Sequence, residues 1–459
     1  MAQAHKPQVS RVSRRRFVQA ASVAAAGFPT FIAGSVRGEA AKAPANERLT
    51  LGFIGTGKQA QWHLGALAGN KGCEVLAVCD VDTTRREAAR KFVEDKSKAL
   101  GRKSSVEGYI DFMDVIRRKD IDAVVIATPD HWHAIPIIEA CKAGKDIYCE
   151  KPLTLTLHEA ALVKQAVRRY GRVLQTGSQQ RSEWKFRVAC ELVRSGRIGK
   201  IKEVVVNVGT SSKPCDLPEE TMEPGLDWER WLGPAPLRPY HSVLSPRGVH
   251  NHYPHWRNYR EYSGGMMTDW GAHHFDITQW GLGMDGSGPN RITPPQDPKA
   301  DRGVVYHYDK TPVGDNVAVI HAVGAHTFTT EKGEKVTCGV TFKGESGIIG
   351  CDRGKLHSDP VDIVASLDPK DPSKGLSVHL YDSRNHHQDW LDCIRTRKDP
   401  ICSVDVGAGS VAVCHLGNLA YWNRRPLKWD PVKWEFPGDA QADAWRDRER
   451  RGAYQLPTL

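Results

Sequence analysis

The chain has 459 residues, of which 40% are hydrophobic and 26% charged, a balance that is typical of a folded globular protein. One hydrophobic core rarely serves so long a chain, so we expect two domains. The formal net charge is +10, but residues 1–40 carry six basic residues against one acidic residue, which gives +5 of this total. The remaining charge forms no basic stripe, which argues against a nucleic-acid-binding protein.

Residues 1–40 resemble a twin-arginine signal peptide. Arg14 and Arg15 precede Phe17, and a weakly apolar, alanine-rich run follows that Pro29 interrupts. The alternative is a basic N-terminus without this role. We expect the twin-arginine export machinery to deliver the mature chain to the periplasm. No later segment contains roughly 18 uninterrupted apolar residues, so no membrane-spanning helix is predicted.

After this leader, the sequence predicts a dinucleotide-binding unit. A short apolar strand over residues 49–54 leads into the turn Gly55-Thr56-Gly57, and an amphipathic helix follows. Together with Ala60, the turn has the spacing G-x-G-x-x-A. The two glycines allow backbone N–H groups to approach a pyrophosphate at the helix N-terminus, and a small third residue allows the helix to pack closely.

An acidic residue follows at the distance that this motif requires. The next apolar run reaches Asp80, twenty residues beyond Ala60. Its carboxylate could accept hydrogen bonds from the ribose hydroxyls and would repel a 2′-phosphate, which favours NAD over NADP. Arg85 and Arg86 lie close by and keep NADP possible, although solvated charges at the start of a helix are the favoured interpretation of both.

Further alternation of strands and helices predicts a parallel sheet. The runs DAVVIAT and DIYCE are largely apolar without alternation and are separated by a helix, as in sheets buried on both faces. Ligands of such sheets bind at the carboxyl ends of the strands. The predicted cofactor-binding residues therefore follow these strands: Gly55, Thr56, Gly57, Lys58, Gln59, Asp80, Thr128, Pro129, Asp130, His133, Glu150 and Lys151.

Lys151 is the first candidate for catalysis. Pro152 ends the strand because it has no N–H and a fixed φ, which leaves Lys151 at the rim of the sheet. There its ammonium could face a hydroxyl or carbonyl group that is being oxidised or reduced. On the residues alone, a lysine paired with a surface carboxylate stays an open alternative.

The second half of the chain supplies the substrate candidates. Residues 210–260 form a long predicted loop rich in Trp, Tyr, His, Pro and Arg, and loops of this length inside a compact domain are usually functional. Aromatic faces with Arg and Asn donors suit a sugar ring. The candidates for substrate contact are Arg181, Trp256, Arg257 and Tyr262, whereas most other aromatic residues of the loop are expected only to anchor it.

Four motifs together resemble the Gfo/Idh/MocA family of oxidoreductases. They are GFIGTG, ATPDHWH, EKPL and SGGMMTDWGAHHFDITQW, and the resemblance runs from about Leu49 to near the C-terminus. It implies an α/β fold with an N-terminal Rossmann domain and a C-terminal α/β domain whose large, open, mixed β-sheet forms the substrate face and commonly an oligomer interface. The expected parts are a signal peptide (1–40), the Rossmann domain (48–175), the substrate and oligomerisation domain (176–425) and an extension packed on the body (426–459).

The same resemblance assigns catalytic roles. It places Lys151 beside nicotinamide and substrate, and it selects Asp269 and His273. An interval of four residues puts two side chains on one face of a helix, so Asp269 could orient the imidazole while the imidazole takes or returns a proton. Without the resemblance, an interior structural histidine would be favoured. The other His and Asp residues nearby lack the spacing of a metal site, so no metal is expected.

We therefore expect an exported NAD(P)-dependent oxidoreductase that transfers a hydride at a CH–OH group of a sugar, polyol or glycoside and that forms a homo-oligomer. One alternative is a glycoside hydrolase or lyase that oxidises a ring hydroxyl transiently and recycles a bound NAD. Export favours this alternative somewhat, because free NAD is scarce outside the cytoplasm. A catalytically silent sugar-binding protein is the third alternative, and the presence of Lys151, Asp269 and His273 together argues against it.

Overall fold

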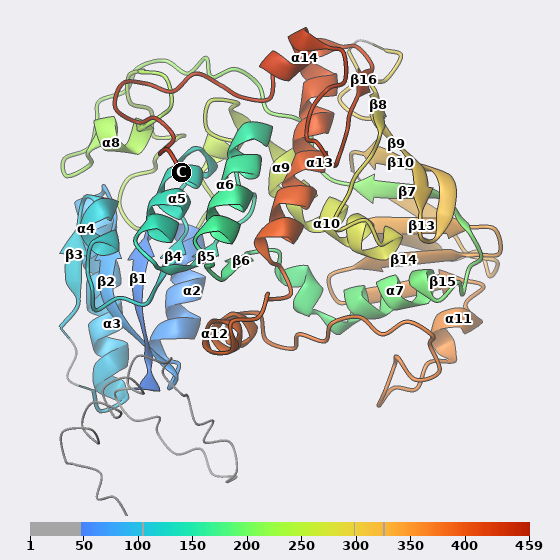
Figure 1. Ribbon diagram of the computed structural model, residues 1–459, viewed down its shortest axis with the longest axis horizontal. Helices are drawn as coiled ribbons and strands as arrows, with labels where there is room; N and C mark the ends of the chain where they lie inside the picture. The colour runs from blue at the N-terminus through green and yellow to red at the C-terminus, as the bar shows by residue number, and fades with distance from the viewer. Residues whose placement is uncertain (1–46, 103–104, 298, 325) are drawn as a thin grey trace, which may run out of the picture. The chain divides into compact units, whose positions relative to one another are not determined.

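The computed structural model describes residues 47–102, 105–297, 299–324 and 326–459. The predicted signal peptide, residues 1–40, lies outside the described residues. The described chain belongs to one compact unit, Ala43–Leu459, which holds two large β-sheets (Figure 1). Within these residues, no helix is both long and apolar enough to cross a membrane.

The first sheet has six parallel strands in the order β3-β2-β1-β4-β5-β6. The strands are β1 (Leu49–Ile54), β2 (Cys73–Cys79), β3 (Glu107–Tyr109), β4 (Ala123–Ile126), β5 (Asp146–Cys149) and β6 (Leu174–Thr176). The helices between them are α2 (Lys58–Ala68), α3 (Thr83–Ala99), α4 (Phe112–Ile116), α5 (Ala134–Lys142) and α6 (Leu157–Arg169). β4 and β5 are buried along their whole length, which explains their apolar sequences. The strand order reverses between β1 and β4, so a ligand is expected at the carboxyl ends of these strands.

The second sheet has eight strands in the order β15-β14-β13-β7-β10-β9-β8-β16. They are β7 (Ile201–Asn207), β8 (Arg291–Thr293), β9 (Val305–Thr311), β10 (Gly314–Ala322), β13 (Val340–Gly344), β14 (Ile348–Asp352), β15 (Lys355–Asp359) and β16 (Leu427–Lys428). β7 and β10 are parallel and the other neighbours are antiparallel, so the sheet is mixed. β11 (His326–Thr329) and β12 (Lys335–Cys338) pair separately. These two sheets confirm the predicted α/β fold.

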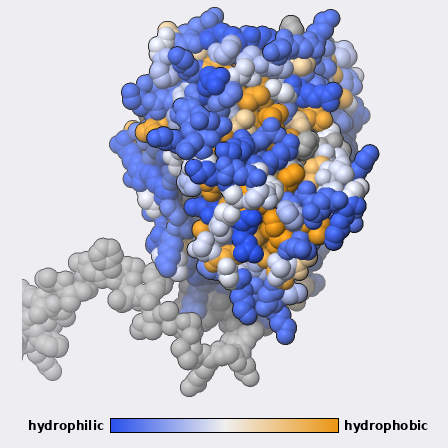
Figure 2. All heavy atoms as spheres, turned by 90° about the vertical axis from the view of Figure 1, so that its right-hand side faces the viewer, coloured by the Kyte–Doolittle hydropathy of each residue, from blue (hydrophilic) through white to orange (hydrophobic). Residues whose placement is uncertain are grey.

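Helices fill the space between the two sheets (Figure 1). α7 (Trp184–Arg194), α10 (Gly271–Leu282) and α13 (Val404–Asn423) contact the second sheet, and α13 also packs on α6 of the first. The view from the side of the second sheet shows hydrophobic residues through the middle of the surface, interspersed with hydrophilic ones (Figure 2). α12 (His386–Thr396) returns to the first sheet, where Trp390 is fully buried in the same hydrophobic cluster as Leu51 and Phe53 of β1.

The segment between β7 and α10 has a small hydrophobic core of its own. It contains α8 (Trp228–Leu232), the short 3-10 helix η4 (His255–Asn258) and α9 (Met266–Asp269). Trp231, Tyr240 and Tyr259 belong to this core. Most aromatic residues of the long loop therefore anchor it.

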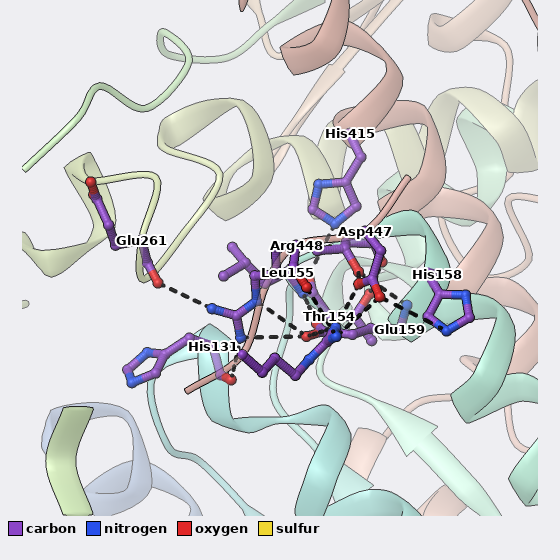
Figure 3. Close-up of polar contacts among 11 residues, drawn as sticks. His131, Thr154, Leu155, His158, Glu159, Glu261, His415, Asp447 and Arg448 are labelled. Atoms are coloured by element: carbon purple, nitrogen blue, oxygen red, sulfur yellow. Dashed lines mark hydrogen bonds and ion pairs between the residues drawn. The ribbon is translucent and has the colours of Figure 1, made fainter. Parts of the chain in front are cut away.

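The last residues of the chain lie across the first half. After α14 (Ala440–Ala444), the guanidinium of Arg448 donates to the main-chain oxygen atoms of His131, at 2.9 Å, and Glu261, at 3.4 Å. It also lies 3.4 Å from the buried carboxylate of Glu159. Figure 3 shows these contacts, in which one side chain joins the loop after β4, the long loop and the start of α6. Beyond Arg448, Leu456 and Leu459 pack on the hydrophobic core of the first sheet.

Candidate active site

A cavity of about 970 Å³ lies at the carboxyl edge of the first sheet. Its volume is at the upper end of what ligand and cofactor sites usually have, roughly 300–1,000 Å³. The loops after β1, β2, β4 and β5 line one side, and the long loop, α9 and α10 line the other. Most of the sequence-predicted site residues meet here.

The glycine turn forms one end of this cavity. Gly55 has φ +86°, and a Cβ atom there would lie 2.7 Å from the main-chain nitrogen of Thr128, so the turn requires glycine. Gly57 precedes α2, no side chain caps the helix, and nothing lies within 4 Å of where its Cβ would be. The first N–H groups of α2 therefore face open space, which fits the pyrophosphate of a dinucleotide. Lys58 and Gln59 line the cavity beside them.

Asp80 is held in the cavity wall by three hydrogen bonds. Thr56 donates to its carboxylate from the N–H, at 2.8 Å, and from the hydroxyl, at 2.9 Å, and the N–H of Asp82 donates at 2.9 Å. Thr56 does not itself line the cavity, so its contribution is to hold Asp80. The remaining acceptor capacity of the carboxylate suits ribose hydroxyls. Arg85 and Arg86 donate to main-chain oxygen atoms, so the protein itself engages both guanidinium groups.

The loop after β4 contributes Thr128, Pro129 and Asp130 to the cavity. The hydroxyl of Thr128 is buried without a hydrogen-bond partner in the described part of the chain, and such a group suits a bound cofactor. Burial raises the pKa of Asp130 to about 7, although Ser263 donates to its carboxylate at 2.6 Å. The predicted cofactor contact of His133 is wrong. Its ring is buried and lies between two main-chain oxygen atoms, so it joins the loops after β4 and β5 instead.

Glu150 is buried next to His63, which in turn contacts His387, and no sequence motif indicated either histidine. Its carboxylate lies 2.7 Å from Nε2 of His63, and Gln59 donates to it at 2.9 Å. Nδ1 of His63 lies 2.8 Å from Nε2 of His387, on α12. Burial alone would raise the pKa of Glu150, but the hydrogen bond and charge of His63, with Lys151, lower it to about 2. Glu150 is therefore an anion that holds the start of the Lys151 loop.

Lys151 and Asp269 join the two sides of the cavity. The ammonium of Lys151 donates to the Asp269 carboxylate at 2.6 Å and to its main-chain oxygen at 3.1 Å. Nε of Arg257 lies 3.5 Å from the same carboxylate. Burial opposes ionisation of Asp269, but the charges of Lys151 and Arg257 hold its pKa below the usual value. A charged lysine is thus fixed at the rim of the sheet, with one N–H unused.

His273 lines the same cavity and is nearly fully buried. Burial, followed by the charges of Lys151 and Arg353, lowers the pKa of His273 well below its usual value, so the ring is neutral. The expected orientation of this ring by Asp269 is wrong, because Asp269 pairs with Lys151 and Nδ1 of His273 has no partner among the described residues. α9 ends at Asp269 and α10 begins at Gly271, so the two side chains do not share one regular helix.

Two of the four predicted substrate contacts lie in the cavity. Trp256 and Arg257 line it, and the guanidinium carbon of Arg257 lies 4.2 Å from the centre of the Trp256 ring. The predictions for Arg181 and Tyr262 are wrong, because both side chains are buried away from the cavity. Arg181 forms ion pairs with Asp276 and Asp285, and Tyr262 packs in the small core of the long loop.

Three further residues line the cavity and were not predicted from the sequence. Trp270 follows Asp269 directly, Arg353 projects from the turn between β14 and β15, and Tyr454 belongs to the C-terminal tail. Only Trp270 lies in a motif that could have indicated it. No three His, Cys, Asp or Glu side chains of the described chain are grouped so that they could hold a metal ion.

A Rossmann-type sheet whose cavity extends from an open glycine turn to a fixed lysine is the arrangement of a nicotinamide-dependent oxidoreductase. Comparison with protein families agrees with this class. Residues 49–178 match the NAD-binding Rossmann fold of an oxidoreductase family, and residues 208–456 match the C-terminal alpha/beta domain of the same family. The chain therefore belongs to the Gfo/Idh/MocA oxidoreductase family, as its motifs predicted.

Relatives with assigned names align over about a third of the chain. An inositol 2-dehydrogenase of Salmonella typhimurium is 32% identical over 154 residues, which cover 33% of this chain and 43% of that protein. A glycosyl hydrolase family 109 protein of Shewanella pealeana is 30% identical over 164 residues, which cover 32% and 35%. The chain thus spans less than half the length of these relatives.

Solved structures resemble the chain over most of its length. The WlbA dehydrogenase from Bordetella pertussis, in complex with NADH and UDP-GlcNAcA, has a TM-score of 0.56 and 18% identity, with 83% of this chain and 98% of that chain covered. Levoglucosan dehydrogenase, in complex with NADH and levoglucosan, has a TM-score of 0.54 and 18% identity, with 83% and 99% covered. At this identity, the likeness shows the shared fold.

Proposed function

We propose that the protein is an exported, NAD-dependent oxidoreductase that acts at a CH–OH group of a sugar, polyol or glycoside. The observation that carries this proposal is that Lys151, Asp269 and His273 line one cavity with the turn at Gly55 and Gly57. The family supports the cofactor, and the inositol 2-dehydrogenase among the relatives supports a polyol or sugar substrate. When bound, NAD supplies the hydride acceptor.

The chain's own residues would manage the hydroxyl proton. Because Asp269 fixes the ammonium of Lys151, the unused N–H can donate to the substrate oxygen and stabilise the negative charge that develops there. His273 is neutral and can accept the hydroxyl proton. A protonated His273 is unfavourable beside Lys151, so the proton must pass to water or another acceptor before the next turnover.

Redox-neutral cleavage of a glycoside is the second candidate. The glycosyl hydrolase family 109 relative favours it, and so does the expected export, because a recycled cofactor removes the need for free NAD. In such a reaction a ring hydroxyl is oxidised only transiently, the neighbouring C–H becomes acidic, and the glycosidic bond is eliminated. After water has added in place of the leaving group, the hydride would return from the cofactor to the ketone carbon, so the cofactor would end in the redox state in which it began.

Periplasmic location and a homo-oligomeric state belong to the same proposal. Arg14 and Arg15 with the alanine-rich run support export by the twin-arginine route. The hydrophobic residues on the side of the second sheet support an interface between copies of the chain (Figure 2). Cell fractionation and light scattering of the purified protein test these two points. Recovery only from the cytoplasm, or only as a monomer, would contradict them.

The activity is tested by purifying the mature chain, identifying any bound nucleotide by mass spectrometry, and screening sugars, polyols and glycosides with NAD and NADP. Formation of NADH on a sugar or polyol is the result expected for the first candidate. Glycoside cleavage without net NADH formation would support the second. Sugar binding without either reaction would leave only a binding protein.

A further inference from the structure

The turn between β14 and β15 is fixed so that it presents Arg353 to the cavity. Asp352 pairs with Lys355 across this two-residue turn, and Gly354 has φ +69°. The N–H of Gly354 donates to the carboxylate of Glu183 at 2.7 Å. The main-chain oxygen of Gly354 accepts a hydrogen bond from the ammonium of Lys185. Both polar main-chain atoms of Gly354 are thus bound by side chains at the start of α7. The turn is therefore docked on the body rather than free in solvent.

Arg353 lies over the ring of Trp270, at the same end of the cavity as His273. Its guanidinium carbon is 4.5 Å from the ring centre of Trp270, and that ring is 6.1 Å from the ring of His273. Stacking on an aromatic face holds the guanidinium in one plane and leaves its N–H edge available. Both Arg353 and Trp270 line the cavity.

In the described part of the chain, no carboxylate neutralises Arg353. The nearest candidate in sequence, Asp352, accepts a hydrogen bond from the main-chain N–H of Arg353, at 2.7 Å, and the guanidinium takes part in no ion pair. By contrast, Arg257 shares the carboxylate of Asp269 with Lys151. The guanidinium of Arg353 is thus a cation at the cavity wall without a protein anion.

The charges around this end of the cavity do not balance. Lys151, Arg257 and Arg353 are positive and line the cavity, and the ionised carboxylate of Asp269 pairs with the first two. Four other acids line the cavity. Asp80 and Asp111 follow β2 and β3, at the nucleotide end, and both accept hydrogen bonds from main-chain N–H groups. Nearer to Lys151, Glu150 is turned toward His63 and Gln59, and Asp130 accepts a hydrogen bond from Ser263 and has a raised pKa. An excess of cations in a partly enclosed site is unfavourable unless a ligand supplies negative charge.

We propose that the substrate is an acidic sugar, with a carboxylate or phosphate group that Arg353 binds while Lys151 and His273 act on a hydroxyl of the same molecule. The planar guanidinium matches either anion through two parallel hydrogen bonds, and Trp270 beneath it holds it in place. The inference deepens the proposed function and rests on it. The dinucleotide's own phosphates are not the anion in question, because their expected place is the N-terminus of α2, beside Gly57 and Lys58.

Matched pairs of neutral and acidic sugars test this inference on the full mature chain loaded with NAD. The pairs are glucose with glucuronate, galactose with galacturonate, and glucose with glucose 6-phosphate, which separates carboxylate from phosphate. The variants are Arg353→Gln and Arg353→Lys, with Arg384→Gln as the control, since Arg384 is 88% exposed and pairs with Asp382 away from the cavity lining. kcat/KM is measured for each sugar, and the affinity for NAD is measured separately.

We expect the natural protein to prefer the acidic member of at least one pair. Arg353→Gln should lower kcat/KM for that member roughly ten- to a hundredfold, mainly through KM, because a charge-assisted hydrogen bond is lost. The neutral partner should change by less than about threefold, Arg353→Lys should keep part of the preference, and NAD affinity should not change. A preference for the neutral sugars, or equal losses on both members, would overturn the inference while leaving the oxidoreductase intact.

Failure of the proposed function gives a different result. If none of the sugars is oxidised or cleaved, calorimetric binding of glucuronate, galacturonate and glucose 6-phosphate to the NAD-loaded protein still tests Arg353. Binding that Arg353→Gln weakens and Arg384→Gln does not would support the acidic-ligand site without the chemistry. Absence of binding, or binding that is indifferent to Arg353, would overturn it.

Discussion

The two walls of the cavity are built in different ways. On the side of the first sheet, short loops at the ends of buried parallel strands carry the cavity residues, and main-chain packing holds them, as where Gly55 lies against Thr128. The opposite wall comes from the long loop, the β14–β15 turn and the C-terminal tail, which side chains such as Arg448 hold in place. Strand order thus fixes the nucleotide end, whereas contacts between distant segments shape the substrate end.

Lys151 is where the two walls meet, and its loss should have the largest effect. In Lys151→Ala, the substrate oxygen loses its cationic donor and Asp269 keeps only Arg257 as a partner. We expect kcat to fall by roughly 10² to 10⁴-fold with little change in NAD affinity. The measurement is steady-state turnover on the substrate that the screen identifies. Lys91→Ala is the control, because Lys91 pairs with Asp95 on an exposed helix face, and a loss below tenfold in Lys151→Ala would remove Lys151 from the mechanism.

Arg448→Gln disturbs the second wall at a largely buried cation that joins three segments of the chain. The substitution removes the donor to the main-chain oxygen atoms of His131 and Glu261 (Figure 3). Glu159 keeps Arg450 as a partner. Because two main-chain oxygen atoms lose a charged donor, we expect the free energy of unfolding to fall by about 2–4 kcal/mol. Denaturant unfolding measures this change.

The matched control for Arg448 is an arginine that pairs in solvent. Arg90 lies on the solvent side of α3, where it pairs with Glu87 and Glu94, so Arg90→Gln should change the free energy of unfolding far less than Arg448→Gln. In addition, Arg448→Gln should raise KM for the substrate, because Arg448 joins the loop that carries Asp130 to the long loop. Equal stability of the two variants would show that the tail contributes nothing to the second wall.

Gly55→Ala should destabilise the protein through the first wall, and by less than Arg448→Gln does through the second. The positive φ and the 2.7 Å approach to the main chain of Thr128 leave no room for a methyl group, so we expect a loss of about 1–3 kcal/mol in the free energy of unfolding and weaker NAD binding. Gly57→Ala is the matched control, since Gly57 has φ −67° and open space around its Cβ position. Its stability should be unchanged, whatever the effect on the nucleotide, and equal destabilisation by both variants would contradict the strain argument.

The sequence could predict the first wall because its signals are local. The glycine turn, Asp80 at the end of β2 and Lys151 before Pro152 each follow directly from the residues around them. Apolar runs give the strands, and the ends of parallel strands meet at one edge. The predictions for these residues needed no knowledge of distant partners.

The wrong predictions for Arg181 and for the pairing of Asp269 share one cause, which is a partner far away in the sequence. The prediction for His133 is different, since one main-chain oxygen beside its ring belongs to Thr128, five residues earlier. Arg181 was placed correctly after β6, but its side chain turns to Asp276 and Asp285, 95 and 104 residues further on. Asp269 has His273 four residues away, yet Lys151, 118 residues away, binds its carboxylate. Spacing along the chain indicates which side chains could pair. Which of these pairs forms depends on how the two halves of the chain pack against each other.

The pH dependence of stability offers the finest test of the first wall, through Asp130. Because burial raises its pKa to about 7, the folded protein keeps this carboxyl protonated at pH values where the unfolded chain, with an ordinary pKa of 3.8, has lost the proton. The folded state therefore binds more protons between these two values, so stability is greatest below about pH 4 for this group and falls as the pH rises toward 7. The slope approaches about 1.3 kcal/mol per pH unit. Asn cannot titrate, so Asp130→Asn should flatten the curve of unfolding free energy between pH 5 and 7, whereas Asp95→Asn on the exposed face of α3 should leave its slope unchanged. Parallel curves for Asp130→Asn and the natural protein would mean that Asp130 is ionised in the folded state, and the loop after β4 would then carry a fixed negative charge into the cavity.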